Sequence, residues 1–269
     1  SRLLSLLESF GSCAVAMSAG VDSSVMAKAA FLALGDRAVA ITGVSASLAT
    51  GELDEAREIA ERIGIRHVAL DTQEFGSADY VRNAPDRCYH CKTELYTQMR
   101  TAADRLGMAV IANGANADDV SDYRPGMTAA SEHNVRSPLL ECGIAKAEVR
   151  ALAAEWDLPV WDKPASPCLS SRVAYGEAVT PERLSMIDRA ESWLREQGLG
   201  VVRVRYHAGD LARVEVPGEA IERLAAAEVR EAMVALLKSL GFKFVTLDLE
   251  GFRSGSQNLV LPIVEIGGR

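Results

Sequence analysis

Residues 13–31, CAVAMSAGVDSSVMAKAAF, contain the turn that decides how the first half of this chain folds. The apolar run 14–17 predicts a buried strand, and a helical pattern follows the small residues at 18–24. The first-turn amides of a helix have no intrahelical partner, and they lie at the positive end of the helix dipole. Small side chains let an anion approach those amides, and serine hydroxyls add donors. We therefore predict an anion-binding turn at 18–24, with a serine-rich N-cap at an ordinary strand–helix turn as the alternative.

The turn differs from two common nucleotide-binding loops, because it has neither the lysine of G-x-x-x-x-G-K-[ST] nor the spacing of G-x-G-x-x-G. It resembles the S-G-G-x-D-S loop of the PP-loop ATP pyrophosphatases, which grip the β- and γ-phosphates of ATP and release pyrophosphate. The residues that this resemblance places at the phosphates are Ser18, Ala19, Gly20, Val21, Asp22, Ser23 and Ser24. Ala19 stands where those proteins have their first glycine, so the loop must have room for one methyl group.

The composition is that of a globular protein with one large or two modest domains: 269 residues, 48% hydrophobic and 25% charged. The net charge of −8 argues against a large sequence-independent grip on nucleic acid. No run approaches the roughly 18 apolar residues of a membrane span. Residues 1–10 predict a short amphipathic helix rather than a signal peptide. We expect a cytoplasmic protein without a nucleic-acid or membrane partner.

Apolar runs alternate with helical patterns, such as 52–63 and 92–106, from residue 13 to about 165. The runs that read as strands are 13–17, 38–44, 67–72, 108–115 and 135–140. This alternation predicts an α/β fold with a Rossmann-like parallel sheet covered on both faces. Ligands bind at the carboxyl ends of such strands, so Gly114 and Asp119, which follow the fourth run, should lie near the 18–24 turn.

The alternating pattern breaks at 161–167, where two prolines mark a boundary. We expect two domains, 1–165 for ATP binding and 166–269 for substrate binding and oligomerisation. In the second, Thr180 and Pro181 should begin a helix. The elements that together predict a small α+β domain are this helix to about 198, hairpin strands at 201–207 and 212–217, a helix near 218–240 and a strand at 243–249. A loop at 251–258 should face the active cleft or a partner subunit.

The five cysteines are an odd number, which argues against a disulfide framework. Cys13 and Cys142 lie in apolar contexts and are predicted to be core residues. Cys88 and Cys91 form a C-x-x-C pair that suits half a zinc site, a redox pair or merely a helix start. With Cys168 they make three cysteines without an evident fourth, which suits a [4Fe–4S] cluster with one open iron.

Cys168 follows Pro167 in a predicted loop, and Arg172 lies four residues further on. A partly exposed cysteine near a cation is typical of a thiol that acts as nucleophile or metal ligand. An inert linker cysteine is the alternative.

Five segments, in one order across nearly the whole chain, resemble the LarE family. They are SAGVDSS at 18–24, RCYHCK at 87–92, NGANADD…DYRPGM at 113–127, SPCLSSR at 166–172 and LDLEGFRSGSQN at 247–258. LarE proteins are ATP-dependent pyridinium biscarboxylate mononucleotide sulfurtransferases that help to build the nickel-pincer cofactor of lactate racemase. The resemblance also implies a homo-oligomer, a hexamer.

The resemblance implies that ATP adenylates a substrate carboxylate and that pyrophosphate leaves. Adenylation would replace a poor leaving group, the carboxylate oxygen, by AMP. Sulfur would then attack the acyl-adenylate to give a thiocarboxylate and AMP. Mg²⁺ would neutralise the triphosphate, with Asp22 and Asp119 as candidate ligands or as anchors of its ligands. Helix N-capping is the alternative for Asp118 and Asp119.

Family members differ in their source of sulfur. Some sacrifice the sulfur of the cysteine that matches Cys168 and retain dehydroalanine. Others hold a [4Fe–4S] cluster on three cysteines and recycle it with external sulfide. Because Cys88, Cys91 and Cys168 are all present, the resemblance favours the cluster, with sacrificial sulfur as the alternative.

An anionic mononucleotide needs cations to bind it. Arg203 and Arg205 alternate in VRVRY and therefore share a strand face, and Arg213 follows on the next strand. Three guanidiniums suit bidentate binding of phosphate or carboxylate. A solvated edge strand protected by charge is the alternative. Further candidates for the cleft are Arg124, Glu132 and Arg172.

Three other functions agree with parts of the sequence. A tRNA-thiolating enzyme with the same ATP loop should carry a basic RNA-binding stripe, which the net charge of −8 does not favour. An ammonia-using synthetase of the same loop class would leave Cys168 unexplained. A sensor that binds ATP or iron without turnover would release no pyrophosphate with any candidate carboxylate.

Overall fold

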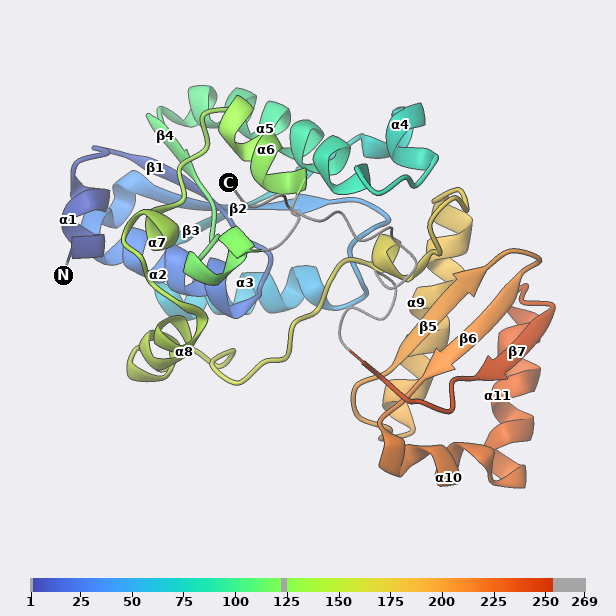
Figure 1. Ribbon diagram of the computed structural model, residues 1–269. Helices are drawn as coiled ribbons and strands as arrows, with labels where there is room; N and C mark the ends of the chain where they lie inside the picture. The colour runs from blue at the N-terminus through green and yellow to red at the C-terminus, as the bar shows by residue number, and fades with distance from the viewer. Residues whose placement is uncertain (1, 122–124, 254–269) are drawn as a thin grey trace, which may run out of the picture. The chain divides into compact units, whose positions relative to one another are not determined.

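The computed structural model describes residues 2–121 and 125–253, which form two compact units (Figure 1). The first unit comprises the chain up to Tyr80 together with Asp86–Pro167. The second comprises the short segment Val81–Pro85 and the described chain from Cys168 onward. Each unit has its own sheet.

The first unit contains a four-stranded sheet with strand order β3-β2-β1-β4, and every neighbouring pair is parallel. Its strands are β1 (Cys13–Ala16), β2 (Ala38–Val44), β3 (Arg66–Asp71) and β4 (Val110–Ala112). Val15 of β1 lies between Ala40 of β2 and Ala112 of β4. The predicted Rossmann-like α/β fold is therefore confirmed. The strand order reverses between β1 and β4, and ligands of such sheets bind outside the carboxyl ends of the strands at this point.

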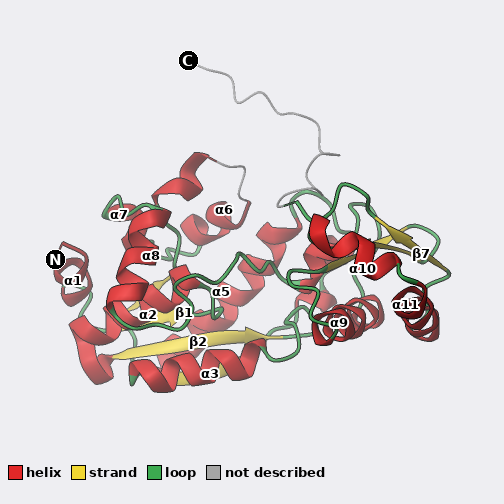
Figure 2. Cartoon of the chain, turned by 90° about the horizontal axis from the view of Figure 1, so that it is seen from below, coloured by secondary structure: helices red, strands yellow, loops and turns green. Residues whose placement is uncertain are grey.

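Helices cover both faces of this sheet, as the apolar strands predicted (Figure 2). The helices of the first unit are α1 (Arg2–Glu8), α2 (Val21–Leu34), α3 (Glu52–Ile63), α4 (Ala78–Val81, reaching into the second unit), α5 (Arg87–Leu106), α6 (Pro125–Glu132), α7 (Pro138–Glu141) and α8 (Lys146–Glu155). Cys13 and Val15 pack with α1, α2, α3 and α8, whereas Ala14 packs with α5 and α6. Successive strand residues thus face opposite layers, because side chains alternate across a strand.

The prediction of a strand at 135–140 is wrong. Arg136 makes only an isolated bridge with Ala112, and the chain then enters α7 at Pro138. Proline has no N–H for a sheet ladder, but it suits the first position of a helix, where that N–H would have no partner. The Glu141 carboxylate accepts from the backbone N–H of Ser137 at 3.0 Å, which stabilises this helix start.

The helix predicted at 92–106 begins earlier than expected, at Arg87. Cys88 and Cys91 therefore lie within the first turns of α5. The helix ends at Leu106, before Gly107 in a left-handed conformation, which is a common helix C-terminus.

The second unit contains a three-stranded sheet, order β5-β6-β7, with helices beside it. Its elements are β5 (Arg203–His207), β6 (Leu211–Glu215), β7 (Phe244–Leu247), α9 (Pro181–Glu196), α10 (Ile221–Ala225) and α11 (Ala227–Ser239). β5 and β6 are antiparallel, which confirms the predicted hairpin, and β7 runs parallel to β6. At the start of α9 the backbone N–H of Arg183 donates to Thr180 Oγ1 at 3.3 Å, which confirms the predicted cap.

The helix predicted near 218–240 is interrupted at Ala226, whose extended backbone separates α10 from α11. Short 3-10 turns complete the two units at Gly35–Arg37, Glu74–Gly76, Ala117–Ser121, Leu169–Arg172 and Gly218–Ala220. Among the described residues, no helix has the length and apolar character needed to cross a membrane. The loop predicted at 251–258 lies mostly outside the described residues.

Candidate active site

The turn predicted to bind an anion follows β1 and leads into α2, at the carboxyl edge of the sheet. Ser23 holds this turn together: its hydroxyl donates to Gly20 O at 3.0 Å and accepts from the backbone N–H of Ser18 at 3.1 Å. The Ser24 hydroxyl is buried without a hydrogen-bond partner among the described residues. A buried hydroxyl without a partner is costly, and an anion seated in the turn would supply an acceptor.

Ala19 has φ +54°, the left-handed conformation that glycine adopts without strain. For an alanine this conformation costs about 1–2 kcal/mol. The methyl group is fully buried in the core of the first unit, so the expected room for it is present. The fold thus accommodates alanine at the position where PP-loop proteins have their first glycine. The methyl group packs in the core, but the backbone at Ala19 is strained.

Gly114, in the loop after β4, lies directly against the start of α2. A Cβ at this position would come within 2.8 Å of backbone atoms of Asp22 and Ser23. Real Cβ atoms essentially never show such contacts, so only glycine allows this approach. The two loops that leave β1 and β4 meet here, as the sequence predicted for Gly114.

Asp22 is held by two residues that follow β4. Asn116 Nδ2 donates to Asp22 Oδ1 at 2.9 Å, and Lys146 Nζ forms an ion pair with Asp22 Oδ2. The backbone N–H of Asn116 donates to Asp119 Oδ2 at 3.0 Å, so Asn116 brings Asp22 and Asp119 to one place. The Asp118 carboxylate accepts from the backbone N–H of Lys146 at 2.9 Å, which is the helix-capping role considered for it.

A second lysine also reaches the turn. Lys163 Nζ donates to Ala19 O at 3.1 Å and to Glu55 Oε2 at 2.5 Å. Sequence reasoning missed both Lys146 and Lys163, because they are more than a hundred positions away from the turn. Neither lysine belongs to a local sequence motif, so no signal in the sequence could have identified them.

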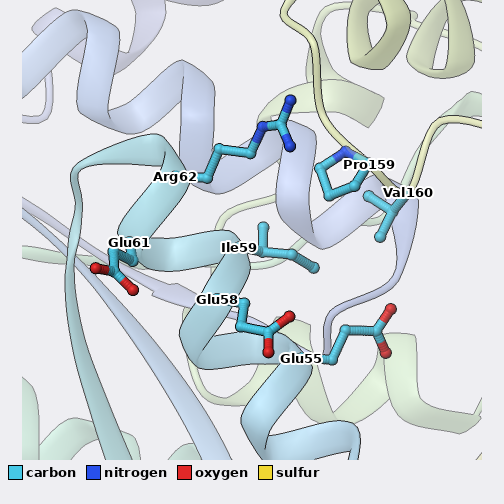
Figure 3. Close-up of a pocket in the computed structure, with 7 residues that line it drawn as sticks. All are labelled: Glu55, Glu58, Ile59, Glu61, Arg62, Pro159 and Val160. Carbon is cyan, nitrogen blue, oxygen red and sulfur yellow. The ribbon is translucent and has the colours of Figure 1, made fainter.

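A pocket of about 500 Å³ lies between α3 and the chain at Pro159 and Val160 (Figure 3). Its lining residues are Glu55, Glu58, Ile59, Glu61, Arg62, Pro159 and Val160. Figure 3 shows the side chains of Glu55, Glu58 and Ile59 directed to one side of the helix and that of Glu61 directed away. Three glutamates against one arginine make the lining acidic, so it does not suit the phosphates of ATP.

The cysteines of the first unit divide into two kinds. Cys13 is fully buried, and burial raises its pKa to about 12, while Cys142 packs partly buried against the same core. Cys13 is a core residue, as predicted, whereas Cys142 lies at the edge of that core rather than inside it. Cys88 is exposed and Cys91 half-buried. Three positions apart on α5, they share one helix face.

Tyr89, between the two cysteines, donates from Oη to Glu132 Oε2 at 2.6 Å. This hydrogen bond raises the pKa of Tyr89. Glu132, a predicted cleft residue, lies at the end of α6, which packs closely on α5: a Cβ at Gly126 would meet the Lys92 side chain at 3.2 Å. The structure therefore places Glu132 beside the cysteine-bearing turns.

Cys168 is exposed and belongs to the second unit. The Arg172 guanidinium donates to the Cys168 carbonyl oxygen at 2.9 Å and to Glu191 Oε1 at 3.0 Å. Arg172 and Glu191 are both buried. The arginine thus fixes the backbone at Cys168. Within the described part of each unit, no three Cys, His, Asp or Glu side chains gather as a metal centre would require.

The predicted arginine face is present on β5 and β6. Arg205 lies opposite Arg213, and Arg203 lies opposite Glu215. Glu215 accepts from Arg205 at 2.8 Å and from Arg213 at 3.0 Å. Arg203 and Arg205 are only 7% and 5% exposed, which contradicts the alternative of a solvated edge strand. Arg124, another candidate, lies outside the described residues.

Burial lowers the pKa of Arg203 to about 10, and the neighbouring guanidiniums of Arg172 and Arg205 add to this effect. Charge repulsion between buried cations is relieved by a bound anion. The face thus combines buried arginines with the buried carboxylates of Glu191 and Glu215. Sequence reasoning found its arginines but missed the carboxylates of Glu191 and Glu215 that hold them.

Comparison with known proteins extends this picture. No protein-family model matches the chain. The chain is 46% identical over 264 residues to an uncharacterised protein of Synechocystis sp., covering 97% of this chain and 98% of that one. It is 38% identical over 266 residues to the pyridinium-3,5-bisthiocarboxylic acid mononucleotide synthase of Lactiplantibacillus plantarum, covering 98% and 95%.

A third relative is the tRNA-specific 2-thiouridylase MnmA of Azorhizobium caulinodans, 34% identical over 211 residues, with 63% of this chain and 53% of the relative covered. The parallel sheet and the turn after β1 define an α/β protein of the PP-loop class. The near-complete match to the L. plantarum synthase is more specific. The chain belongs to the LarE family.

Proposed function

We propose that this protein is an ATP-dependent sulfurtransferase that converts a carboxylate of a pyridinium biscarboxylate mononucleotide into a thiocarboxylate for the nickel-pincer cofactor. The observation that carries the proposal is the match, over 98% of the chain, to a relative named for synthesis of the bisthiocarboxylic acid mononucleotide. The first unit would bind ATP, and the second would bind the mononucleotide.

The turn at 18–24 would receive the β- and γ-phosphates of ATP. This assignment is supported by the first turn of α2, where the N-cap residue Gly20 has no side chain that could accept from the backbone amides. Mg²⁺ prefers one or two carboxylates together with substrate phosphates. Asp22 and Asp119, brought together by Asn116, supply that donor set. The metal would neutralise charge on the triphosphate.

The reaction would proceed in two balanced steps. In the first, a carboxylate oxygen of the substrate attacks the α-phosphorus of ATP, which forms the acyl-adenylate and releases pyrophosphate. In the second, a sulfur nucleophile attacks the acyl carbon, the carbon–oxygen bond to AMP breaks, and a thiocarboxylate and AMP result. Removing the substrate oxygen as part of AMP lowers the barrier, because AMP is the better leaving group.

The sulfur would be carried on a [4Fe–4S] cluster held by Cys88, Cys91 and Cys168 and renewed by external sulfide. Thiolates are the preferred ligands of such clusters, and Cys88 and Cys91 on one face of α5 suit two of the three positions. Cys168, the third cysteine of the proposal, belongs to the second unit. The cluster would supply the transferred sulfur through its open iron.

Sacrificial sulfur from Cys168 is the alternative within the same reaction, supported by the exposure of this thiol. The thiolate would attack the acyl-adenylate to form a thioester and release AMP. Loss of the Cys168 Cα proton would then break the Cβ–S bond, leaving dehydroalanine in the chain and releasing the thiocarboxylate.

The face formed by Arg203, Arg205 and Arg213 would bind the phosphate or a free carboxylate of the mononucleotide. Guanidiniums bind such groups in a bidentate manner, and because burial lowers the pKa of Arg203, a bound anion would favour its charged form. The family resemblance is the support for a homohexamer and for a cytoplasmic location. The exposed Phe244 and Leu249, on and just after β7, support association of copies.

A tRNA-thiolating enzyme is the second candidate, favoured by the similarity to MnmA of A. caulinodans. The net charge of −8 counts against it, because RNA binding requires a basic surface. A salt-sensitive complex with tRNA would support this candidate.

Iron and acid-labile sulfide analysis of protein purified without oxygen tests the sulfur source. About four irons and four sulfides per chain, lost in Cys88→Ala, would support the cluster. No iron after reconstitution, with loss of the mass of H₂S from the chain after one turnover, would support the sacrificial route.

A further inference from the structure

Lys163 links the acidic helix α3 to the backbone of the turn at 18–24. Its ammonium donates to Ala19 O at 3.1 Å and to Glu55 Oε2 at 2.5 Å. The Lys163 side chain is largely buried, with 23% exposed. A charge-assisted hydrogen bond to a backbone carbonyl is stronger than a neutral one, and it fixes the direction of that carbonyl.

Lys163 is itself fixed from two sides. Arg150 of α8 donates to the carbonyl oxygens of Trp161 at 2.7 Å and of Lys163 at 3.0 Å, which anchors the backbone. Glu55 anchors the ammonium. The Lys163 side chain therefore approaches Ala19 from a defined position. Because it is already held, its hydrogen bond to Ala19 O costs little further conformational entropy.

The carbonyl of Ala19 and the N–H of Gly20 belong to one peptide unit. No described peptide bond is cis, and in a planar trans peptide these two groups point in opposite directions. By holding Ala19 O, Lys163 therefore sets the direction of the Gly20 N–H. Gly20 tolerates either sign of φ, so this peptide has the freedom to rotate when nothing holds it.

We propose that Lys163 is a positioning residue for ATP: it holds the 19–20 peptide so that the Gly20 N–H faces the β- and γ-phosphates. This inference rests on the proposed binding of ATP at 18–24. Lys163 acts through the turn, and Glu55 acts through Lys163. Strain at Ala19, whose φ is +54°, gives the turn a reason to relax once the ammonium is removed.

Binding of a non-hydrolysable ATP analogue with Mg²⁺, and separately of AMP, tests the proposal by calorimetry. Lys163→Met should lower the affinity for the analogue by about tenfold or more, since a charge-assisted hydrogen bond is lost. The affinity for AMP should stay within about twofold of that of the wild-type protein. Glu55→Gln should lower the affinity for the analogue by a smaller factor. The variant with both substitutions should bind the analogue no more weakly than Lys163→Met does. Lys163→Arg, which keeps a cationic donor, should recover part of the affinity.

Lys28→Met is the matched control, because Lys28 is on α2 and contacts Phe31 rather than the turn. Unchanged analogue binding in Lys163→Met, or equal loss of analogue and AMP, would overturn the positioning role. If Lys163→Met does not fold, the same comparison between the two ligands in Glu55→Gln decides. Failure of the wild-type protein to bind the analogue would instead overturn the proposed function.

Discussion

Gly114 and Asp22 are in direct backbone contact, so the loop after β4 supports the first turn of α2 from outside. A Cβ at Gly114 would lie 2.8 Å from the Asp22 carbonyl carbon. The same loop holds the Asp22 side chain through Asn116. The turn at 18–24 is thus positioned by the loop after β4, at the point where the strand order reverses, and its geometry depends on that contact.

Gly114→Ala should displace the start of α2 and weaken binding of an ATP analogue by more than tenfold. Overpacking of this kind also costs about 1–3 kcal/mol of stability, which urea unfolding would measure. Gly76→Ala is the control, since a Cβ at Gly76 meets nothing within 4 Å. Equal binding in the two variants would mean that the close approach does not position the turn.

Asp22→Ala should abolish pyrophosphate release in the presence of ATP and the mononucleotide. The change removes a candidate Mg²⁺ ligand and leaves the Lys146 ammonium without its carboxylate partner. Asp36→Ala, in the 3-10 turn Gly35–Arg37 after the same helix, should release pyrophosphate normally. Normal release by Asp22→Ala would disprove the assignment of ATP to this turn.

Cys168→Ala should abolish transfer of sulfur while ATP-dependent adenylation remains measurable. The substitution removes one thiol from an exposed position and leaves the Arg172–Glu191 pair intact. Product analysis for thiocarboxylate, alongside pyrophosphate release, separates the two steps. Retained thiocarboxylate would exclude Cys168 from the mechanism.

Phosphate should stabilise the protein through the arginine face. The folded-state pKa of Arg203, about 10, is lower than the ordinary value of a guanidinium. Folding therefore disfavours the charged form, and this cost is present below about pH 10 and disappears as pH rises through that value. A bound phosphate should offset the cost and raise the melting temperature at neutral pH.

Arg203→Met should gain less thermal stability from added phosphate than the wild-type protein, because one guanidinium of the face is removed. Arg57→Met, which removes an exposed pair with Asp54, is the control and should change little. An Arg203→Met variant whose melting temperature rises with phosphate as much as that of the wild-type protein would refute the anion site.

The sequence predicts the fold where a pattern is local and repeated. The runs at 38–44 and 52–63 coincide with β2 and α3 because apolar spacing decides both. The prediction of a strand at 135–140 was wrong because Pro138 begins a helix there, despite the apolar character of this segment. The interruption of the helix near Ala226 also escaped prediction, since no glycine or proline marks it.

The site divides in the same way. The turn at 18–24 is contiguous, so its residue types allow its chemistry to be predicted from the sequence alone. Lys146, Lys163 and Asn116 become part of the site only through the folding of distant segments. The pairing of Glu215 with Arg205 depends on strand register, which residue types alone do not fix.

The most direct test of the central claim is mass spectrometry of the mononucleotide after incubation with the protein, MgATP and sulfide without oxygen. The proposed function predicts exchange of one carboxylate oxygen for sulfur, with one AMP and one pyrophosphate formed for each exchange. An unchanged substrate mass under conditions in which the protein binds both ATP and the mononucleotide would contradict it.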